Sequence, residues 1–505
     1  MKNKYILPLT ATITLFLTGC FSDEGNYDYT EIIETTAPGI ESSYNVVSLQ
    51  DTLRIDPGLT PGDAFEYLWI LGHLSPPHLD TIGRENVLDY PVKLKSGLYE
   101  IVLRATNLAN GQPTYHRTSL SVVTPFSVGF YVLKDMGDHT DLDLHIPTDD
   151  EPLSNLLEKS DDGVMNGKPT SLGVTFDYSF NNPETNTNER AITLNICAGE
   201  EARIIRVDDM TTIYTNQEFF LGEVSTATPY YITHHGGGMV YVTSEGIFFN
   251  DLLMQGDGKF GIKRPVTMGK AGYVPNPRSL VAAPEIYFYD DLNHRFLGLE
   301  GSMGLIISGD DNVIPHELLY LGCNYAYRMM YQGYAIFQDR DVPGKRYLYQ
   351  TMMASGVSFI TGTAEINPSL KFNEATYFAT NELDAFAIYF LHDNRLYMYD
   401  VNNGIEIPLA PQGFPAGEEI TYVSNRYYQN PADAEANFNY LAIATHQAGR
   451  YKIYLYNIVG GQPYGNPVRI LEGEGKVAKM QYFTNKFLTD PNAASVNNNY
   501  IPLSI

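Results

Sequence analysis

The sequence is poor in cysteine, tryptophan and basic residues. It has 3 cysteines, 1 tryptophan, and 33 Lys+Arg against 59 Asp+Glu in 505 residues, which gives a formal net charge of −26. An acidic surface of this kind repels nucleic acid and anionic lipid headgroups, so neither is an expected partner. No Cys-x-x-Cys pair is present, so the sequence does not support a zinc–thiolate site.

Strong catalytic motifs are also missing from the sequence. There is no HExxH, no GxSxG and no Walker loop. His316-Glu317 begins like a zincin helix, but the second histidine is absent and Pro315 precedes the pair. We therefore expect a protein that is not an enzyme and that needs no cofactor or metal.

The N-terminus has the pattern of an export signal. Met1–Lys4 is positively charged, and the apolar run Ile6–Leu17 is shorter than the roughly 20 residues that span a bilayer. The following Leu17–Cys20 resembles a lipobox, the cleavage site of lipoprotein signal peptidase. We predict a signal peptide over 1–19 and lipidation of Cys20, which would be the only membrane anchor.

An acidic stretch follows the predicted lipid site. Residues 20–25 form a short tether with Asp23 and Glu24. The tether resembles the surface-export signal of some Gram-negative lipoproteins, which favours an outer-membrane protein facing the cell exterior. The alternative is a merely solvated tether. The other two cysteines, Cys197 and Cys323, lie in separate apolar runs. One disulfide is conceivable in an oxidising compartment, but two buried thiols are favoured.

Residues 26–124 are typical of a small β-sandwich. Short alternating stretches recur in the order 46–49, 53–55, 65–70, 97–105 and 119–123, and the first two are predicted to form a hairpin. About seven short strands in about 100 residues is the size of an immunoglobulin-like domain.

This first part also resembles PKD-like family lipoproteins. The resemblance rests on Gly25–Tyr29, on Tyr67–Trp69 and on Gly97–Tyr99. It implies that Trp69 lies in the sandwich core and that the strand of Tyr99 leads into a long core strand. It further implies an accessory surface lipoprotein of a SusCD-type, TonB-dependent nutrient importer.

Residues 125–505 contain a loose repeat of two apolar strands joined by a tight turn. The last five copies begin near 239, 286, 334, 386 and 441, which gives spacings of 47, 48, 52 and 55 residues. Spacings near 40 to 50 residues are typical of propeller blades. We predict an all-β protein with a seven-bladed β-propeller behind the sandwich; the alternative is a pair of further sandwiches. The seven hairpins are 130–133 with 142–144, 192–196 with 202–207, 239–249, 285–289 with 295–299, 334–337 with 346–349, 386–390 with 395–400, and 441–444 with 451–456.

A few polar or aromatic groups are weaker candidates for a site. His234-His235 could hold a metal or a ligand but is interpreted as a polar loop entering the third blade. A spaced acidic set lacks the closing glutamate of an EF-hand and is interpreted as a solvated turn; its members are Asp135, Asp138, Asp141 and Asp143. Two tyrosine pairs in predicted loops could grip a sugar or peptide, namely Tyr230-Tyr231 and Tyr427-Tyr428.

The functional expectation follows from the resemblance and from the missing motifs. It is a non-enzymatic binding or scaffold subunit that captures oligopeptide or oligosaccharide cargo beside its transporter, with ligand-binding residues that the sequence does not identify. The alternative is an extracellular polysaccharide-degrading propeller enzyme, a glycosidase or lyase, because a ring can bring two distant carboxylates together.

Overall fold

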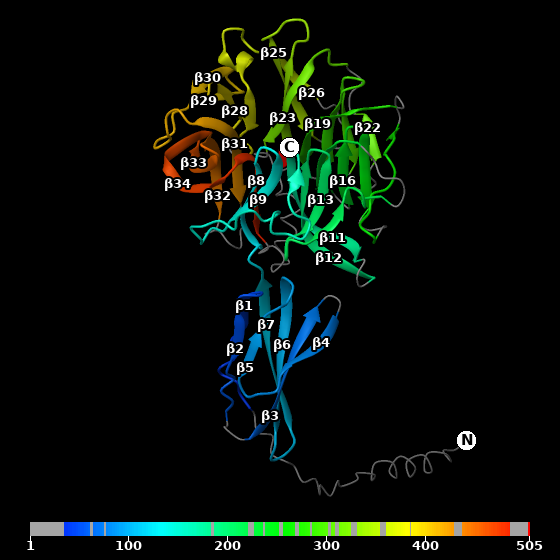
Figure 1. Cartoon of the computed structure of the whole chain (residues 1–505), viewed down its shortest axis with the longest axis vertical. Helices are drawn as coiled ribbons and strands as arrows, with labels where there is room; N and C mark the ends of the chain where they lie inside the picture. Colours follow the sequence, from blue (N-terminus) through cyan, green and yellow to red (C-terminus); the bar gives the residue numbers. More distant parts are fainter. Residues whose placement is uncertain are drawn as a thin grey trace, which may run out of the picture. The chain divides into compact units, whose positions relative to one another are not determined.

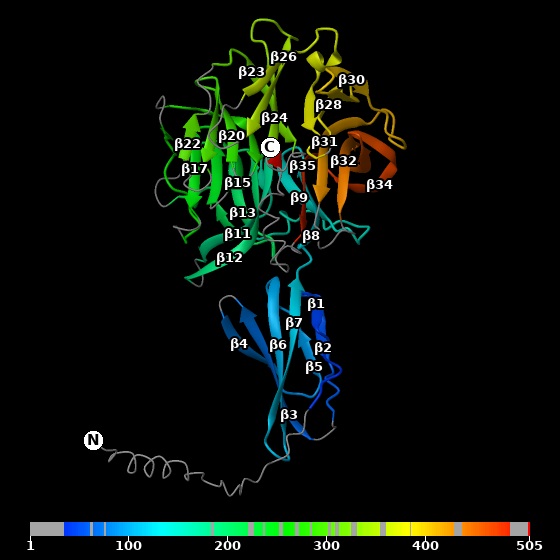
Figure 2. The same ribbon diagram turned by 180° about the vertical axis from the view of Figure 1, so that it is seen from behind.

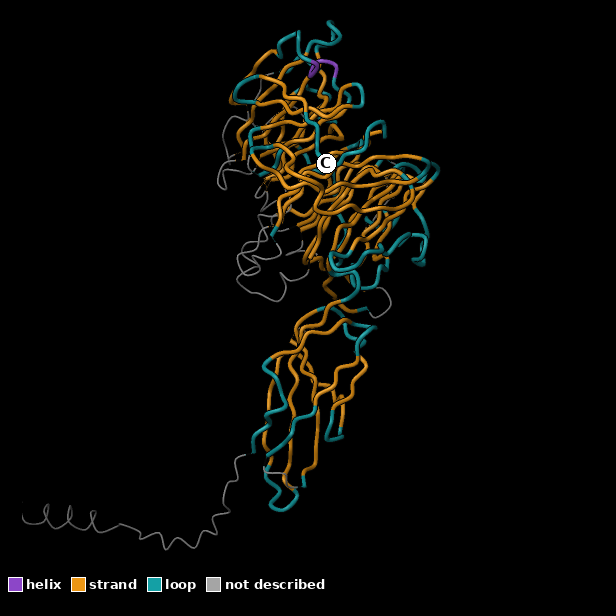
Figure 3. The backbone as a smooth tube through the Cα atoms, turned by 90° about the vertical axis from the view of Figure 1, so that its left-hand side faces the viewer, coloured by secondary structure: helices purple, strands orange, loops and turns teal. Residues whose placement is uncertain are grey.

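The structure is a computed structural model in which nearly every regular element is a β-strand (Figures 1 and 3). One 3₁₀ turn, η1 (Lys371–Glu374), interrupts the strands. Among the described residues, no helix has the length and hydrophobicity needed to span a bilayer. The described residues are 35–60, 64–74, 77–182, 186–220, 227–235, 238–251, 256–267, 272–282, 285–300, 305–308, 313–324, 331–353, 360–383, 385–428, 437–484 and 503–504.

The chain divides into two compact units, one mainly from residues 53–90 and 100–119 and the other mainly from 120–505. The strands before Thr124 form a β-sandwich, as predicted. One sheet has five strands and the other has two. The first is, in order, β1 (Ser43–Val47), β7 (Pro113–Val123), β6 (Gly97–Asn107), β3 (Phe65–Leu74) and β4 (Pro77–Gly83); the second pairs β2 (Thr52–Ile55) with β5 (Leu88–Pro91).

Trp69 on β3 is fully buried, and its Nε1 donates a hydrogen bond to the Glu85 carbonyl at 2.9 Å. Burial of this ring removes a large apolar surface from water while its one polar atom keeps a partner. The position of Trp69 in the core of the sandwich is therefore as the resemblance implied.

The predicted hairpin of 46–49 with 53–55 is wrong, because β1 and β2 belong to different sheets. The chain crosses from one sheet to the other at two consecutive residues. The Ser48 amide donates a hydrogen bond to the carbonyl of Val123 at the end of β7, and the Leu49 amide donates one to the carbonyl of Val92, directly after β5. Val46 and Leu53 are both buried, so each sheet contributes its own apolar face. Alternating hydrophobicity cannot distinguish a hairpin from a crossing between two sheets that share a core.

Seven sheets follow, numbered here as blades 1 to 7 in chain order (Figures 1 and 2). Each predicted hairpin lies in a different blade, so the seven-bladed propeller is confirmed. Blade 1 contains β35 (Lys476–Thr484), β8 (Val128–Asp135), β9 (His139–His145) and β10 (Met165–Asn166). Blade 2 contains β11 (Pro169–Asn182), β12 (Thr187–Ala198), β13 (Glu201–Arg206) and β14 (Thr212–Thr215). Blade 3 contains β15 (Pro229–His235), β16 (Gly238–Thr243) and β17 (Gly246–Asp251).

Blade 4 contains β19 (Pro275–Ala282), β20 (Glu285–Asp290), β21 (Arg295–Glu300) and β22 (Leu305–Ser308), flanked by β36 (Leu503–Ser504) on β19 and β18 (Val266–Thr267) on β22. Blade 5 contains β23 (Glu317–Asn324), β24 (Tyr331–Gln338), β25 (Arg346–Met353) and β26 (Ile360–Glu365). Blade 6 contains β27 (Tyr377–Thr380), β28 (Ala387–His392), β29 (Arg395–Asp400) and β30 (Ile405–Pro408). Blade 7 contains β31 (Glu419–Tyr428), β32 (Phe438–Gln447), β33 (Arg450–Val459) and β34 (Gln462–Glu474).

The first strand of each blade lies on the inside of a closed ring. Each inner strand contacts the inner strand of the next blade, in the order β35, β11, β15, β19, β23, β27, β31 and back to β35. The ring closes within blade 1, where β35 from the end of the chain pairs antiparallel with β8, from Lys476 opposite Asp135 to Thr484 opposite Val128. Closure leaves no inner strand without neighbours on both sides.

The middle strands of the blades are apolar on both faces, because each face packs on a neighbouring blade. On β24, Ala335 and Phe337 join the core shared with blade 4, whereas Tyr334 and Ile336 join the core shared with blade 6. A strand buried on both faces needs a continuous apolar run instead of an alternating one. This requirement explains why the second strand of each blade was the clearest signal in the sequence.

The two cysteines of the propeller are buried and form no disulfide; they lie in β12 of blade 2 and β23 of blade 5. Burial raises the pKa of the Cys197 thiol to about 12. The interpretation as two buried thiols is confirmed, and the disulfide alternative is excluded because the two residues belong to different blades.

Candidate functional site

The residues chosen from the sequence lie in different parts of the molecule. Cys20 and the acidic tether 20–25 lie outside the described residues. His316 precedes β23 and stacks on Tyr347 with ring centroids 4.1 Å apart, and Glu317 begins a strand and not a helix. No zincin arrangement exists at this position.

Three of the predicted loops lie in two strands, β15 and β31. His234 and His235 are the last residues of β15, opposite Met239 and Gly238 in the register with β16, so the loop interpretation is wrong; their side chains lie outside the described part of the chain. Tyr231 on β15 and Tyr428 on β31 are buried. These two tyrosines pack in the propeller core, because both faces of an inner strand are covered.

The spaced acidic set divides into a pair at a turn, with Asp135 half-buried and Asp138 exposed, and a buried pair. Asp135 and Asp138 lie at the β8–β9 turn, where Asp138 pairs with His139 at 2.6 Å. Asp141 and Asp143 on β9 are buried, which corrects the prediction of a solvated turn. Asp141 accepts hydrogen bonds from the Leu142 and Leu157 amides, both at its Oδ1.

Asp143 is the centre of a buried polar group that we call the closure network, comprising Lys134, Asp143, His145 and Tyr451. Lys134 Nζ lies 2.7 Å from Asp143, and both side chains are fully buried. The Tyr451 hydroxyl donates to Asp143 at 2.8 Å, and His145 Nε2 lies 2.8 Å from the same hydroxyl. Burial lowers the pKa of His145 to about 4, so this histidine is neutral at pH 7. The network joins blade 1 to blade 7 and is a structural link.

The inner strands carry cations. Arg426 on β31 donates to the Met480 carbonyl at 2.8 Å and to the Tyr422 hydroxyl at 2.9 Å, and it pairs with Glu382 at 3.4 Å. Burial lowers the pKa of Lys479 on β35 to about 8, and the charges of Arg426 and Arg278 contribute. The protein is strongly acidic as a whole, but the side chains of Arg426 and Lys479 concentrate positive charge on the inner strands.

A pocket of about 930 Å³ lies between blades 1 and 2, and we call it the blade 1–2 pocket. Its lining combines carboxylates, amides and backbone, and no aromatic side chain is among the described lining residues. The lining residues are Asp162, Asn166, Gly167, Gly199, Glu200, Glu201, Ala202, Arg203, Thr215, Asn216, Gln217 and Ala227.

One wall of the blade 1–2 pocket is held rigidly by hydrogen bonds. Buried Arg203 donates to the carbonyls of Gly163 at 2.7 Å and Val164 at 3.0 Å, and pairs with Glu201 at 3.1 Å. Glu201 also accepts the Asn166 amide at 3.2 Å. The charge of Arg203 is therefore used inside the wall and is not available to a ligand.

Two glycines let the pocket's backbone segments meet. Gly167 has φ +85°, and a Cβ added there would stand 2.9 Å from the Gly199 Cα. Any side chain would force the β12–β13 turn away from the segment after β10.

Three side chains of the same pocket remain available to a ligand. Asp162, Glu200 and Gln217 are exposed, and in the described part of the chain they make no hydrogen bond or ion pair. Two carboxylates and one amide offer hydrogen-bond acceptors, one donor group and negative charge. The arrangement suits a polar ligand that is neutral or positively charged.

A smaller pocket of about 510 Å³ lies between blades 1 and 7, above the closure network. Its lining includes Asp150, Glu151, Glu472 and Glu474, while Arg450 lies 3.8 Å from Glu474. The pocket is acidic, because carboxylates outnumber the cations in its lining.

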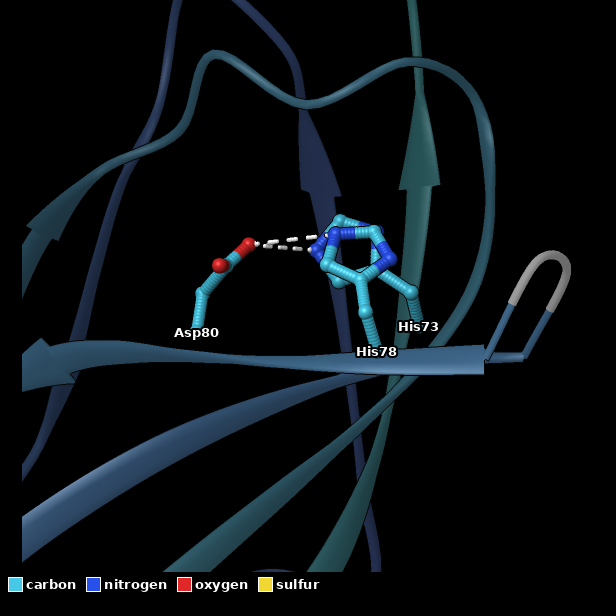
Figure 4. A group of neighbouring side chains, drawn as sticks. All are labelled: His73, His78 and Asp80. Carbon is cyan, nitrogen blue, oxygen red and sulfur yellow. Dashed lines mark hydrogen bonds and ion pairs between the residues drawn. The ribbon is translucent and has the colours of Figure 1, made fainter.

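In the sandwich, two histidines and an aspartate meet on one face of the β3–β4 hairpin (Figure 4). His73 Nε2 lies 2.9 Å and His78 Nε2 3.4 Å from the same oxygen of Asp80. No motif of the sequence pointed to this group. The signal was the spacing of His73, His78 and Asp80, which places all three on one face only if β3 and β4 pair in this register.

Comparison with known families gives one match. Residues 20–169 match the PKD-like family, which confirms the predicted resemblance for this part of the chain. The match covers less than a third of the sequence and extends beyond the sandwich through the first strands of blade 1. No curated protein matches the sequence.

Solved structures show distant likenesses. A quinonprotein alcohol dehydrogenase-like protein from Bacteroides thetaiotaomicron is 11% identical, with a TM-score of 0.42, over 88% of this chain and 97% of that one. The extracellular domain of a putative hybrid two-component system from the same organism is 11% identical, with a TM-score of 0.33, over 84% and 79%. The assignment of the fold rests on the strand pairing described above and not on these likenesses.

Proposed function

We propose that the protein is a non-enzymatic binding subunit that captures a polar ligand in the blade 1–2 pocket at the cell surface. The observation that carries the proposal is the lining of that pocket. A rigid wall of paired groups stands beside three unpaired polar side chains, Asp162, Glu200 and Gln217. Sites that bind ligands combine a preformed cavity with a few positioned polar groups in this way.

The lining favours a peptide over an oligosaccharide. Sugar rings are commonly held by stacking on aromatic faces, and the described lining contains none. The carboxylates of Asp162 and Glu200 attract the ammonium or guanidinium groups of a peptide. Oligopeptide cargo with basic side chains fits this site best.

The surface location and the transporter partner are part of the same proposal. The family match begins at Cys20, the predicted lipid site, and includes the acidic tether. A lipid anchor followed by a β-sandwich would carry the propeller outside the outer membrane. There the protein would act as an accessory subunit of a SusCD-type, TonB-dependent transporter.

The pocket is tested by calorimetric titration with three probes: pentalysine, pentaalanine and maltoheptaose. Pentalysine is expected to bind most tightly. Glu200→Gln and Asp162→Asn should each weaken its Kd by about two- to fivefold, because one exposed charge contributes about 0.5 to 1 kcal/mol. Asp161→Asn is the matched control, since it removes the same charge from a neighbour that does not line the pocket.

Equal binding of pentalysine to the parent and to both pocket variants would contradict the assignment of the pocket. Release of shorter products from maltoheptaose or from acidic polysaccharide would overturn the non-enzymatic function. The transporter is tested separately by affinity purification of the lipidated protein from detergent-solubilised membranes. Recovery of the protein alone would overturn the transporter role and leave the pocket assignment standing.

A further inference from the structure

We infer that His73, His78 and Asp80 form a binding site for a divalent first-row transition-metal ion, with zinc as the best fit. The site lies on the sandwich and is independent of the pocket proposed for the ligand. Figure 4 shows the two imidazoles and the carboxylate converging on one point above the hairpin.

The register of the hairpin brings the three side chains together. His73 on β3 is directly opposite His78 on β4, and Asp80 follows His78 by two residues. Opposed residues of an antiparallel pair share a face, as do residues two apart on one strand. The backbone pairing therefore places all three side chains on one face without contributions from any distant segment.

The separations between the donor atoms match those of a metal site. The Asp80 oxygen lies 2.9 Å from His73 Nε2 and 3.4 Å from His78 Nε2, and all three donor atoms lie within 4.8 Å of one another. Zinc bonds nitrogen and oxygen at about 2.0 Å, so two ligands in a tetrahedral shell stand roughly 3.3 Å apart. A small outward turn of the rings, now stacked with centroids 3.5 Å apart, would direct both nitrogen atoms at one ion.

The donor types select the metal class. Imidazole nitrogen suits zinc, copper and nickel, whereas calcium and magnesium prefer oxygen ligands alone. Two neutral imidazoles and one carboxylate leave a bound divalent ion with a net charge of +1, which a strongly acidic protein stabilises.

The exposure of the site leaves room for a fourth ligand. The His73 side chain is 19% exposed, while those of His78 and Asp80 are 48% and 54% exposed. Solvent therefore reaches the site from one side, and a water molecule or a donor group of a binding partner can complete the coordination shell. Because β4 is the edge strand of its sheet, a bound ion would also fasten this edge to β3.

The test is a titration of the EDTA-treated full-length protein with Zn²⁺ in competition with a chromophoric chelator. We expect one saturable site per chain. His73→Gln and His78→Gln should each weaken Zn²⁺ binding by more than about 100-fold, because even outer-shell partners of a metal contribute 10- to 100-fold. Excess Ca²⁺ or Mg²⁺ should not displace the Zn²⁺.

His139→Gln is the matched control, because His139 pairs with Asp138 at 2.6 Å and the pair offers two donors instead of three. Its Zn²⁺ affinity should equal that of the parent. Unchanged Trp69 fluorescence in the sandwich variants checks that they remain folded. The absorption spectrum with Co²⁺ should show the strong bands of a four-coordinate site. Equal Zn²⁺ binding by the parent and the two histidine variants, or no saturable site in the parent, would overturn the inference.

Discussion

Two junctions between propeller blades differ in chemistry. The junction of blades 4 and 5 is aromatic: Tyr289 and Phe296 pack on Phe337 with ring centroids 5.4 and 6.1 Å away. The junction of blades 7 and 1 also has an apolar core, but it adds the closure network, in which Tyr451 bonds Asp143 across 308 positions of the sequence.

The difference follows from how each junction is connected. Blades 4 and 5 follow one another in the chain, whereas Asp143 of blade 1 and Tyr451 of blade 7 are 308 positions apart. Apolar side chains pack acceptably in several registers, but a hydrogen bond to a buried carboxylate needs one relative position of its two partners. The Lys134–Asp143 ion pair lies within blade 1, so the hydrogen bonds of Tyr451 to Asp143 and His145 are what fix blade 7 against blade 1.

The largest expected effect comes from breaking the ion pair. Lys134→Met leaves the Asp143 carboxylate buried without its cation. We expect this change to lower the free energy of unfolding of the propeller by about 3 to 5 kcal/mol. The melting of tyrosine near-UV circular dichroism measures this loss, while the fluorescence of Trp69, the only tryptophan, reports the sandwich alone. The double variant Lys134→Met/Asp143→Leu should recover most of the loss. A single variant as stable as the parent would show that the pair contributes nothing.

The next effect concerns pH at the same junction. Burial holds the pKa of His145 at about 4, against about 6.5 in an unfolded chain. Between these values the unfolded chain binds more protons, so the contribution of His145 is complete above pH 6.5 and is lost as the pH falls to 4. The integrated change is on the order of 3 kcal/mol. The free energy of unfolding of the propeller, measured from pH 7.5 to 4.5, should fall as the pH is lowered. His145→Gln should flatten the curve, and an equally steep curve in that variant would assign the effect to another group.

The smallest effect is expected when one tyrosine hydroxyl is removed at each of the two junctions and the two losses are compared. Tyr451→Phe removes a hydrogen bond to a buried carboxylate, whereas Tyr289→Phe removes one to the Ile314 carbonyl at 3.2 Å. We expect the free energy of unfolding to fall by about 1.5 to 3 kcal/mol for Tyr451→Phe and by about 0.5 to 1.5 kcal/mol for Tyr289→Phe, because hydrogen bonds to charged groups are stronger than those to neutral groups. Equal losses in urea-induced unfolding would remove the distinction between the junctions.

The sequence predicted the hairpin at the middle of every blade and missed most inner and outer strands. Hairpins such as 334–337 with 346–349 are buried on both faces, so their apolar runs are continuous. Inner strands such as β31 mix Arg426 and Asn425 with apolar residues, because one end of the strand meets polar partners from other blades. Their pattern therefore resembles that of a loop.

The candidate sites could not be predicted from short motifs. The lining of the blade 1–2 pocket comes from segments between Asp162 and Ala227 that belong to two blades. The metal site needs the pairing of His73 with His78, and a one-residue shift in register would place these side chains on opposite faces.

The sequence by itself determined the all-β composition and the seven hairpins, because hydrophobic periodicity acts over a few neighbouring residues. The burial of Trp69 was implied by the resemblance to the PKD-like family. The tertiary structure alone decided which strand closes the ring, which aspartates are buried and which polar groups face a pocket. These features depend on contacts between residues as far apart as Asp143 and Tyr451, and the free energy of such contacts appears only when the ring is closed.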